Sequence, residues 1–261
     1  DFCLSRGLGD VYKRQIKIFS DHREVTKMNK PYIICHMMTS VDGRIDCAMT
    51  SQLPGVEDYY KTLDELNVPT TVSGRVTAEL EMAEPGFFEA KNSETYTQEG
   101  FSKKADAKGY EIIVDTKGKL LWPDASDMDK PYLIITSEQV TKEYLAYLDG
   151  QHISWIACGK ERIDLVRACE ILASEFGVER MGIVGGPAIN TGFLDAGLLD
   201  EISILMGAGI DARREMPSVF DGFAMDHPLV HLKLTNVQRF DSDAIWIRYN
   251  VCLLYTSPSP R

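Results

Sequence analysis

The hydrophobic positions of the chain fall into short apolar runs separated by longer stretches with helical spacing. Most of these runs lack a polar residue at every second position, which is typical of strands covered on both faces of a sheet. Strands that alternate with helices imply right-handed crossovers and a largely parallel sheet. We expect strands at 31–38, 70–73, 111–116, 132–137, 153–157, 180–184 and 201–206, and helices at 57–67, at 75–82, in a segment ending at 148, at 164–176 and from 187 onward.

The last part of the chain follows a different pattern. Residues 230–237 and 244–249 alternate between apolar and polar positions on either side of a turn at 240–243. This period of two predicts a β-hairpin. The predicted fold class is therefore α/β, with a mostly parallel mixed sheet that ends in a C-terminal antiparallel hairpin. The charged, aperiodic stretch 85–110 is expected to form a long excursion from this core.

The stretch Ile183 to Gly192 has the pattern of a strand end, a two-glycine turn at Gly185 and Gly186, and a helix start with Pro187 in its first turn. A proline is tolerated there because the missing N–H has no partner within the helix. Glycines let a phosphate approach the backbone, and the free N–H groups and dipole of the helix attract it. The stretch therefore predicts an anion site, although a tight turn without a ligand has the same pattern.

Two other strand ends carry candidate chemistry. The first strand runs into the polar loop 39–46, where Asp42 lies at the edge at which open α/β sheets bind ligands; an ordinary Asp-Gly turn is the alternative. The strand at 70–73 runs into Gly74, Arg75 and Thr77, which place a cation and a hydroxyl at a helix start. A dinucleotide phosphate would need such groups, and a capped helix with a solvated arginine is the alternative.

Composition and charge narrow the class of partner. The 261 residues carry a net charge of −11 without an offsetting Lys/Arg cluster, which argues against a nucleic-acid surface and favours a small-molecule substrate. The six cysteines show no paired spacing typical of zinc ligands, so no metal is expected, and they are typical of reduced thiols in a cytoplasmic protein. No apolar run approaches the roughly 20 residues that cross a bilayer.

The two ends of the chain differ from its middle. Residues 1–15 have neither a capping signal nor the order of a secretory signal peptide, and residues 252–261 end in a Ser/Pro run. Both ends are similar to translated adaptor sequence, and ordinary disordered tails are the alternative. We therefore expect a flank at 1–27, one folded domain at 28–251 and a tail at 252–261.

Taken in order, these segments resemble the reductase domain of riboflavin biosynthesis, whose fold is that of dihydrofolate reductase. The resemblance covers roughly 31–251. It implies a three-layer α/β/α fold, NADPH across the carboxyl edge of the sheet, hydride transfer to the sugar carbon of a ribosylaminopyrimidine, and a homodimer. The segments that carry it are 38–45 (MTSVDGRI), 74–77 (GRVT), 114–116 (VDT), 185–187 (GGP) and 193–201 (FLDAGLLDE).

The resemblance also implies roles for individual residues. Arg75 is the best candidate for the extra phosphate of NADPH because a guanidinium fork fits a phosphate dianion. Two acids are candidates for catalysis, Asp42 as a substrate anchor or proton relay and Glu81 as a cofactor-side or pocket residue. The other implied cofactor contacts are Gly74, Thr77, Thr116, Ser137, Gly185, Gly186, Pro187, Ala188, Ile189 and Asn190. The implied substrate contacts are Ser40, Asp42, Ser51, Leu53 and Val184.

The chain departs from the family pattern mainly on the substrate side. Val184 stands where relatives often carry a glutamate, the segment 81–88 replaces an Asp-Asn-Pro-x-Leu segment, and Leu53 replaces an aromatic residue. If the site loses a buried polar side chain, it should bind more weakly any substrate that forms a hydrogen bond with that side chain. The given sequence lacks the His-x-Glu and Pro-Cys-x-x-Cys motifs of the zinc deaminase that is often fused to this reductase, so we do not expect deaminase chemistry in these 261 residues.

Three functions therefore stay open. The first hypothesis is an NADPH-dependent reductase of a ribosylaminopyrimidine. The second is an oxidoreductase with the same fold and cofactor that acts on an unrelated carbonyl or imine, or on a pteridine. The third is a nucleotide-binding module without turnover. His36 lies within the first strand and is interpreted as a packed core histidine rather than a catalytic group.

Overall fold

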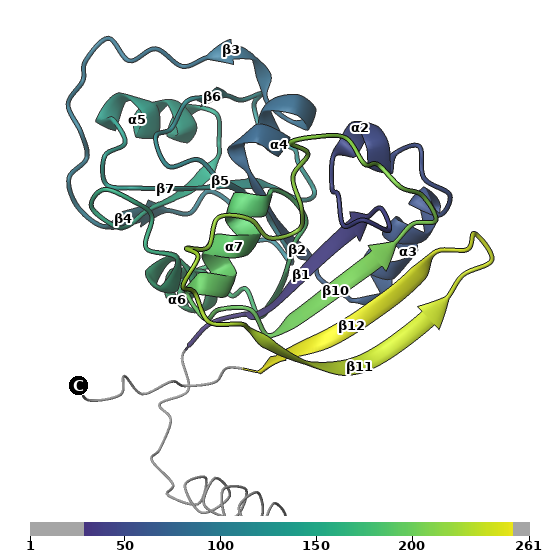
Figure 1. Ribbon diagram of the computed structural model, residues 1–261. Coiled ribbons are helices and arrows are strands. Elements are labelled where there is room, and N and C mark those ends of the chain that lie inside the picture. Colours follow the sequence, from purple (N-terminus) through teal and green to yellow (C-terminus); the bar gives the residue numbers. More distant parts are fainter. Residues whose placement is uncertain (1–28, 253–261) are drawn as a thin grey trace, which may run out of the picture.

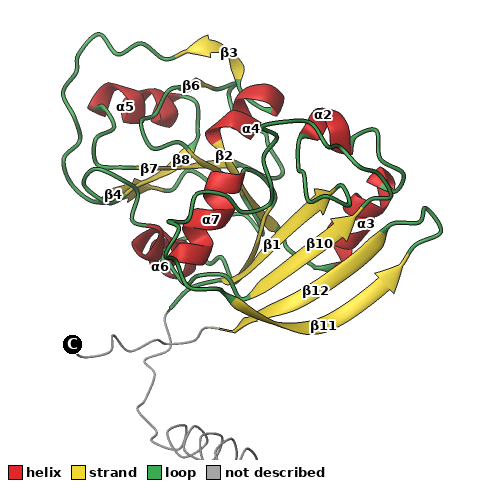
Figure 2. Ribbon diagram, in the orientation of Figure 1, coloured by secondary structure: helices red, strands yellow, loops and turns green. Residues whose placement is uncertain are grey.

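A computed structural model describes residues 29–252 of the chain. Its centre is a twisted sheet of ten strands with helices on both faces (Figures 1 and 2). The predicted flank at 1–27 and residues 253–261 of the predicted tail lie outside the described residues. Within residues 29–252, no helix has the length and apolar composition that crossing a membrane requires.

The strands of this sheet run mostly parallel. From β10 through β1, β9, β2, β5 and β7 to β8, every neighbouring pair is parallel, whereas β12, β11 and β4 are antiparallel additions at the two edges. The strands are β1 Tyr32–Thr39, β2 Thr70–Gly74, β4 Gly100–Ser102, β5 Glu111–Val114, β7 Tyr132–Thr136, β8 Ser154–Ala157, β9 Arg180–Ile183, β10 Glu201–Met206, β11 His231–Arg239 and β12 Ile245–Cys252. The predicted mixed, mostly parallel sheet is confirmed.

The helices form an outer layer on each face of the sheet. On one face α6 and α7 pack on alternate residues of the strands, such as Ile33, Val72 and Ile112. On the opposite face α4 and α5 cover the β5–β8 half and α2 and α3 cover the β1–β10 half. The helices are α2 Cys47–Thr50, α3 Val56–Glu65, α4 Arg75–Glu81, α5 Lys142–Gly150, α6 Leu165–Ser174 and α7 Pro187–Asp195. This is the predicted three-layer α/β/α arrangement.

Four short elements were not predicted from the hydrophobic pattern. The excursion after α4 contains β3 (Glu84–Phe87), which pairs with β6 (Leu120–Leu121), and the edge strand β4. All four residues of β3 are exposed, so they have no buried face to create an apolar pattern. The helix α2 is a single turn of four residues. These elements depend on tertiary contacts rather than on local sequence.

The predicted hairpin is present and is longer than expected. Strand β12 pairs with β10 on one side and with β11 on the other, and a bulge between Leu234 and Asn236 shifts the register of β11. Cys252 pairs with His231 at the end of β12. The last pair of the hairpin therefore includes Cys252, the first residue of the predicted tail.

His36 lies in the core, as predicted. Its ring is fully buried in β1 and stacks on Tyr59 at 4.7 Å between ring centroids. Trp246 donates to the Ser203 hydroxyl, which lies 2.9 Å from His36 Nδ1, and the Thr62 hydroxyl lies 3.1 Å from Nε2. Burial lowers the pKa of His36 to about 4. The ring is therefore neutral at pH 7 and connects the sheet to α3.

Candidate functional site

The parallel core brings the predicted site residues to one edge of the sheet. Because neighbouring strands from β10 to β8 run in the same direction, their carboxyl ends lie side by side. In spatial order this edge carries the loop after β10, the Ser40–Asp42 loop after β1, the glycine turn after β9, the start of α4 after β2, Thr116 after β5 and Ser137 after β7. Residues far apart in sequence therefore meet along one line.

The two glycine turns at the centre of this edge are in direct contact. A Cβ on Gly74 would lie 2.9 Å from Ile189 Cγ1, and a Cβ on Gly185 would lie 2.9 Å from the Thr77 hydroxyl. Each turn therefore needs glycine because the helix that follows the other turn occupies the space. The starts of α4 and α7 form one surface, and Thr77 belongs to both turns.

The start of α7 has the features of an anion site. Gly186 caps the helix with φ +94°, a backbone conformation that favours glycine, and Pro187 stands in the first turn as predicted. The first N–H groups of a helix have no partner within it, and they point outward with the positive end of the dipole. The edge is thus able to hold a pyrophosphate.

Asn190 is placed differently from its prediction as a cofactor contact. Its side chain is fully buried, and its Nδ2 donates to the Val219 carbonyl at 2.7 Å. Its Oδ1 is buried without a hydrogen-bond partner among the described residues. The amide therefore anchors the segment that follows β10, and neither of its polar atoms is exposed to a ligand in this structure.

A second feature of the edge is an open cleft of about 690 Å³ at the end of β5. Arg75, Lys117 and Lys119 line it together with Thr116 and the half-exposed ring of Phe87. Arg75 donates to Glu79 at 2.6 Å on the same helix, so part of its charge is already paired. Two carboxylates also line the cleft, those of Glu89 and Asp115, and the second accepts hydrogen bonds from backbone N–H groups. The three cations beside an aromatic ring fit a phosphorylated nucleoside.

The two lysines were missed in the sequence analysis. They follow the Asp115-Thr116 strand end in the pattern Lys-Gly-Lys, and Gly118 turns the chain with φ +62°. The Asp115 carboxylate accepts from the Lys119 N–H at 2.7 Å and fixes this turn. Alternating cations directly after a strand end were the signal that could have found them.

Ser137 offers no surface to a cofactor. It is fully buried at the end of β7, and its hydroxyl donates to the Thr116 carbonyl at 2.9 Å. The same carbonyl also accepts from the Thr136 hydroxyl at 3.1 Å. The Ser137 hydroxyl is therefore engaged in holding Thr116 at the cleft, and the contact of Ser137 with a cofactor stays a prediction that its burial disfavours.

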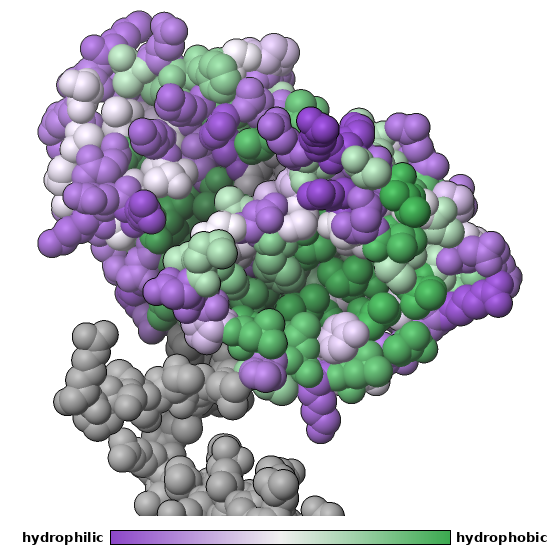
Figure 3. All heavy atoms as spheres, viewed as in Figure 1, coloured by the Kyte–Doolittle hydropathy of each residue, from purple (hydrophilic) through white to green (hydrophobic). Residues whose placement is uncertain are grey.

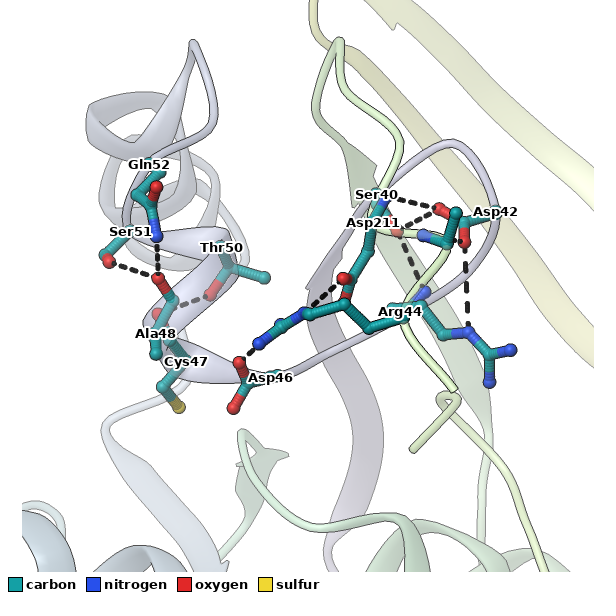
Figure 4. A network of polar contacts seen from close by, with 12 residues as sticks. Ser40, Asp42, Arg44, Asp46, Cys47, Ala48, Thr50, Ser51, Gln52 and Asp211 are labelled. Carbon is teal, nitrogen blue, oxygen red and sulfur yellow. Dashed lines mark hydrogen bonds and ion pairs between the residues drawn. The ribbon is translucent and has the colours of Figure 1, made fainter. Parts of the chain in front are cut away.

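The Asp42 carboxylate is already occupied by donors of the protein. It accepts from the Ser40 hydroxyl at 2.7 Å and from the Asp211 and Ala212 amides at 3.0 Å each, and Arg44 Nε lies 3.8 Å away (Figure 4). The hydrogen bond from Ser40 and then those from the two amides hold the pKa of Asp42 far below its usual value. Because three donors of the protein already occupy this carboxylate, it has little capacity left for a proton relay, and the roles predicted for Asp42 stay predictions.

The remaining predicted residues lie around the same edge. Ser40 is buried, and its hydroxyl donates to Asp42. Leu53 is buried against Gly207 and Gly209, whereas Ser51 is exposed on α2 and donates to the Ala48 carbonyl at 3.3 Å (Figure 4). Val184 is half-buried at the end of β9.

Glu81 is the exposed last residue of α4. Burial, and then the charge of Glu81, raises the pKa of the Cys47 thiol at the start of α2. Glu81 therefore lies near Cys47 at the start of α2. Within residues 29–252, no three His, Cys, Asp or Glu side chains converge in the way a metal ion would need.

Comparison with known proteins agrees with this geometry. Residues 31–246 match the model of the RibD C-terminal domain. The chain is 23% identical over 238 residues to 2,5-diamino-6-ribosylamino-4(3H)-pyrimidinone 5′-phosphate reductase of Methanothermobacter thermautotrophicus, and the match covers 85% of this chain and 99% of that protein.

Solved structures show the same fold. A pyrimidine reductase-like protein of Corynebacterium diphtheriae superposes with a TM-score of 0.65 at 17% identity, over 90% of this chain and 98% of its own. The riboflavin biosynthesis reductase of Saccharomyces cerevisiae superposes with a TM-score of 0.54 at 17% identity, over 94% of this chain and 99% of its own. The predicted dihydrofolate-reductase-like fold is confirmed.

Proposed function

The chain belongs to the RibD C-terminal domain family, and from that premise we propose that it is a reductase of riboflavin biosynthesis that reduces a ribosylaminopyrimidine phosphate with NADPH. The observation that carries this proposal is the pair of glycine turns in contact at the carboxyl edge of the sheet. The surface left open by these glycines, the start of α7 and the cleft at the end of β5 follow one another along the same edge of the sheet, as the phosphates and base of a dinucleotide would require.

A reductase of this pathway takes its hydride from a nicotinamide, and the cofactor, when bound, supplies that hydride. The task of the protein is to bind the cofactor and the substrate, to orient them toward each other and to exclude water from the space between them. In our proposal the N–H groups at the start of α7, with Gly185, Gly186, Pro187, Ala188 and Ile189, hold the pyrophosphate. Gly74 and Thr77 border it from α4, where the Thr77 hydroxyl is a free donor at the line between the turns.

We assign the cofactor's 2′-phosphate to the cleft at the end of β5. Arg75, Lys117 and Lys119 place three positive charges there, and Thr116 adds a half-buried backbone and hydroxyl. Hydrogen bonds between cations and phosphate are about twice as strong as neutral ones. The ring of Phe87 is available to an adenine. This charge favours NADPH over NADH, which lacks the 2′-phosphate.

The substrate lies, in this proposal, between the loop after β1 and the end of β9. Ser51 and Val184 border that space, while Ser40, Asp42 and Leu53 shape it from behind. Glu81 stays the candidate acid, because its exposed carboxylate is not engaged in any ion pair among the described residues. Hydride transfer itself needs little more from the protein than a held geometry.

One observation favours a second candidate substrate. Val184 offers no hydrogen-bonding group at the end of β9, so an unrelated carbonyl or imine, or a pteridine, would meet an apolar wall there. A site built to hydrogen-bond its substrate strongly rejects an analogue that lacks the hydrogen-bonding group. An apolar site discriminates much less between such compounds. Turnover on a carbonyl, imine or pteridine but not on the ribosylaminopyrimidine would support this second candidate.

We also propose that the protein is a homodimer joined through the hairpin end of the sheet. Leu232, Leu234 and Val237 of β11 are exposed and lie on the same face as Ile247 and Tyr249 of β12. Apolar surface spreads over the part of the molecule where β10, β12 and β11 lie (Figure 3). A second copy fits this face, because a two-fold axis pairs one surface with itself.

The cofactor proposal is tested by fluorescence titration of the protein with NADPH and with NADH. We expect NADPH to bind more tightly than NADH. Each of the variants Arg75→Ala, Lys117→Ala and Lys119→Ala should weaken the binding of NADPH about tenfold, roughly 1.4 kcal/mol, and leave the binding of NADH unchanged. Arg239→Ala, which removes an exposed cation on the hairpin, is the matched control.

The same preparation tests turnover. Oxidation of NADPH in the presence of a ribosylaminopyrimidine phosphate is the expected result. Tight binding of NADPH without oxidation across pyrimidines, carbonyls, imines and pteridines would instead identify a nucleotide-binding module. Absence of binding of either nucleotide at millimolar concentration would overturn the assignment as an oxidoreductase.

A further inference from the structure

The chain that leaves β10 crosses the carboxyl edge of the sheet before it reaches the hairpin. We call residues Gly207 to Asp221 the strap. In Figure 1 it runs from the arrowhead of β10 past α2 and α4 and then down beside α7. It contains no helix or strand, so hydrogen bonds to other segments must hold its position.

The first anchor of the strap is the loop after β1. The Val41 N–H donates to the Gly209 carbonyl at 2.8 Å. Two further amides of the strap, those of Asp211 and Ala212, both donate to the Asp42 carboxylate at 3.0 Å. The carboxylate thus takes up two successive backbone N–H groups that have no secondary structure of their own.

The middle of the strap is joined to the same loop. Arg213 Nη2 lies 2.7 Å from the Asp46 carboxylate, and Arg44 Nη1 donates to the Met216 carbonyl at 2.5 Å. The Ile45 N–H donates to the Pro217 carbonyl at 3.2 Å. Loop and strap therefore move as one unit unless several of these bonds break together.

The second anchor of the strap is α7. The buried Asn190 amide donates to the Val219 carbonyl at 2.7 Å, and the Asp221 N–H donates to the Thr191 hydroxyl at 2.9 Å. Asn190 and Thr191 belong to the first half of α7, directly after the glycine turn. The strap thus connects the loop after β1 to the helix that we propose holds the cofactor's pyrophosphate.

We propose that Asp42 is a positioning residue that holds the strap, and through it the start of α7, in the arrangement that binds the cofactor. Its carboxylate accepts three hydrogen bonds and so has little capacity left for a substrate. Its effect reaches α7 through the strap's second anchor rather than by contact with a ligand. This inference rests on the proposed function in naming NADPH as the ligand whose binding is affected.

The test uses Asp42→Asn, which keeps the shape of the side chain but replaces one acceptor oxygen with an NH₂ group. Without nucleotide, hydrogen exchange of the Asp211 and Ala212 amides should become about tenfold faster, and exchange of the Asp221 amide should rise with them. In the titration NADPH should bind about fivefold more weakly, as a coupling of this kind allows.

The control is Asp58→Asn. Asp58 is likewise a carboxylate held by two donors, Lys61 at 2.8 Å and Ser242 at 2.6 Å, but it ties α3 to the hairpin and does not touch the strap. We expect it to leave strap exchange and NADPH binding unchanged. Arg213→Gln, which releases the exposed middle of the strap, should speed exchange there even if Asp42→Asn folds poorly.

Two results would overturn the proposal. One is faster exchange confined to Asp211 and Ala212, with Asp221 and NADPH binding unchanged. The other is an unchanged Kd for NADPH with a loss of kcat and an altered pH profile, which would make Asp42 a catalytic acid. If the wild-type protein binds no NADPH, the proposed function fails, whereas the exchange experiment still tests whether the strap is one unit.

Discussion

At the scale of single residues, several polar side chains with candidate chemistry serve the fold instead. The buried histidine is the clearest case. The Thr62 hydroxyl donates to the Tyr59 carbonyl at 2.8 Å, so it accepts from His36 Nε2, and the Ser203 hydroxyl, which accepts from Trp246, donates to Nδ1. With these donors and acceptors, the network matches a neutral ring with its proton on Nε2.

This network predicts a dependence of stability on pH. The folded pKa of about 4 lies below the ordinary value of 6.5, so the unfolded chain takes up the proton first as the pH falls. The contribution of the neutral His36 ring to the free energy of unfolding is fully present above pH 6.5 and is lost as the pH falls toward 4. Between pH 7 and pH 5 we expect a loss of about 2 kcal/mol in the free energy of unfolding.

The measurement is urea denaturation of the wild type and His36→Gln at both pH values. The variant cannot titrate at this position, so its loss between pH 7 and pH 5 should be smaller by about 2 kcal/mol. Equal losses in the two proteins would mean that His36 titrates normally in the folded state.

The residue scale is also where sequence analysis was least able to predict the site. The pattern places Asp42, Ser137 and Asn190 at strand ends and a helix start, and the structure agrees. It does not reveal that the Asp42 and Ser137 oxygens are occupied by backbone partners, because those partners belong to segments distant in sequence. Arg213 and the lysines of the cleft lay in stretches without a periodic pattern.

At the scale of elements, the contact between α4 and α7 is the feature that organises the site. Each of the two strand-to-helix turns is shaped by the helix that follows the other turn. The proposed phosphate site at the end of β9 therefore depends on Gly74 at the end of β2. Sequence analysis predicted both turns separately, since each shows a local glycine pattern, but the contact between them follows only from the strand order.

This contact predicts the effect of Gly74→Ala. Gly74 has φ −89°, which alanine adopts easily, so any cost comes from the 2.9 Å approach to Ile189. We expect a loss of about 1–3 kcal/mol in stability, as for overpacking, together with weaker NADPH binding because Ile189 must move. Urea denaturation and nucleotide titration measure the two effects.

The matched control is Gly150→Ala, since a Cβ at the end of α5 meets no atom within 4 Å. It should be neutral or slightly stabilising. Adding Ile189→Ala to Gly74→Ala should cost less than the sum of the two single changes. Simple additivity would show that the two turns are not in contact.

The long parallel strands were the most predictable elements, and the edge elements were the least. Strands β1, β7 and β10 are apolar runs because helices cover both of their faces. Strands β3 and β4 lie at edges and have mostly exposed residues. Their positions depend on the partners β6 and β8 rather than on a pattern of their own.

At the scale of the whole molecule, the hairpin leaves one face of the sheet without a helix among the described residues. The helices α6 and α7 pack on the same side but do not extend over β11 (Figures 1 and 3). Leu234 is 53% exposed and Val237 is 57% exposed. Apolar patches of this kind on soluble domains commonly mark an interface.

The homodimer proposal predicts that Leu234→Lys weakens self-association about 100-fold or more, because the two-fold axis places two copies of the change in one interface. Sedimentation velocity over a range of concentrations measures it. His231→Lys lies on the opposite face of β11 and should leave the dimer intact. A wild-type protein that is monomeric at micromolar concentration would contradict the proposal.

The strand order also affects how the chain folds while the ribosome synthesises it. Among the strands that the structure describes, β1 is synthesised before the others, yet its neighbours are β9 and β10, at residues 180–183 and 201–206. Until those residues have been synthesised, both hydrogen-bonding edges of an almost wholly apolar strand have no native partner. The growing chain therefore carries an apolar strand without its native partners until residue 206 has been made, and we expect chaperones that act on nascent chains to bind it during that time.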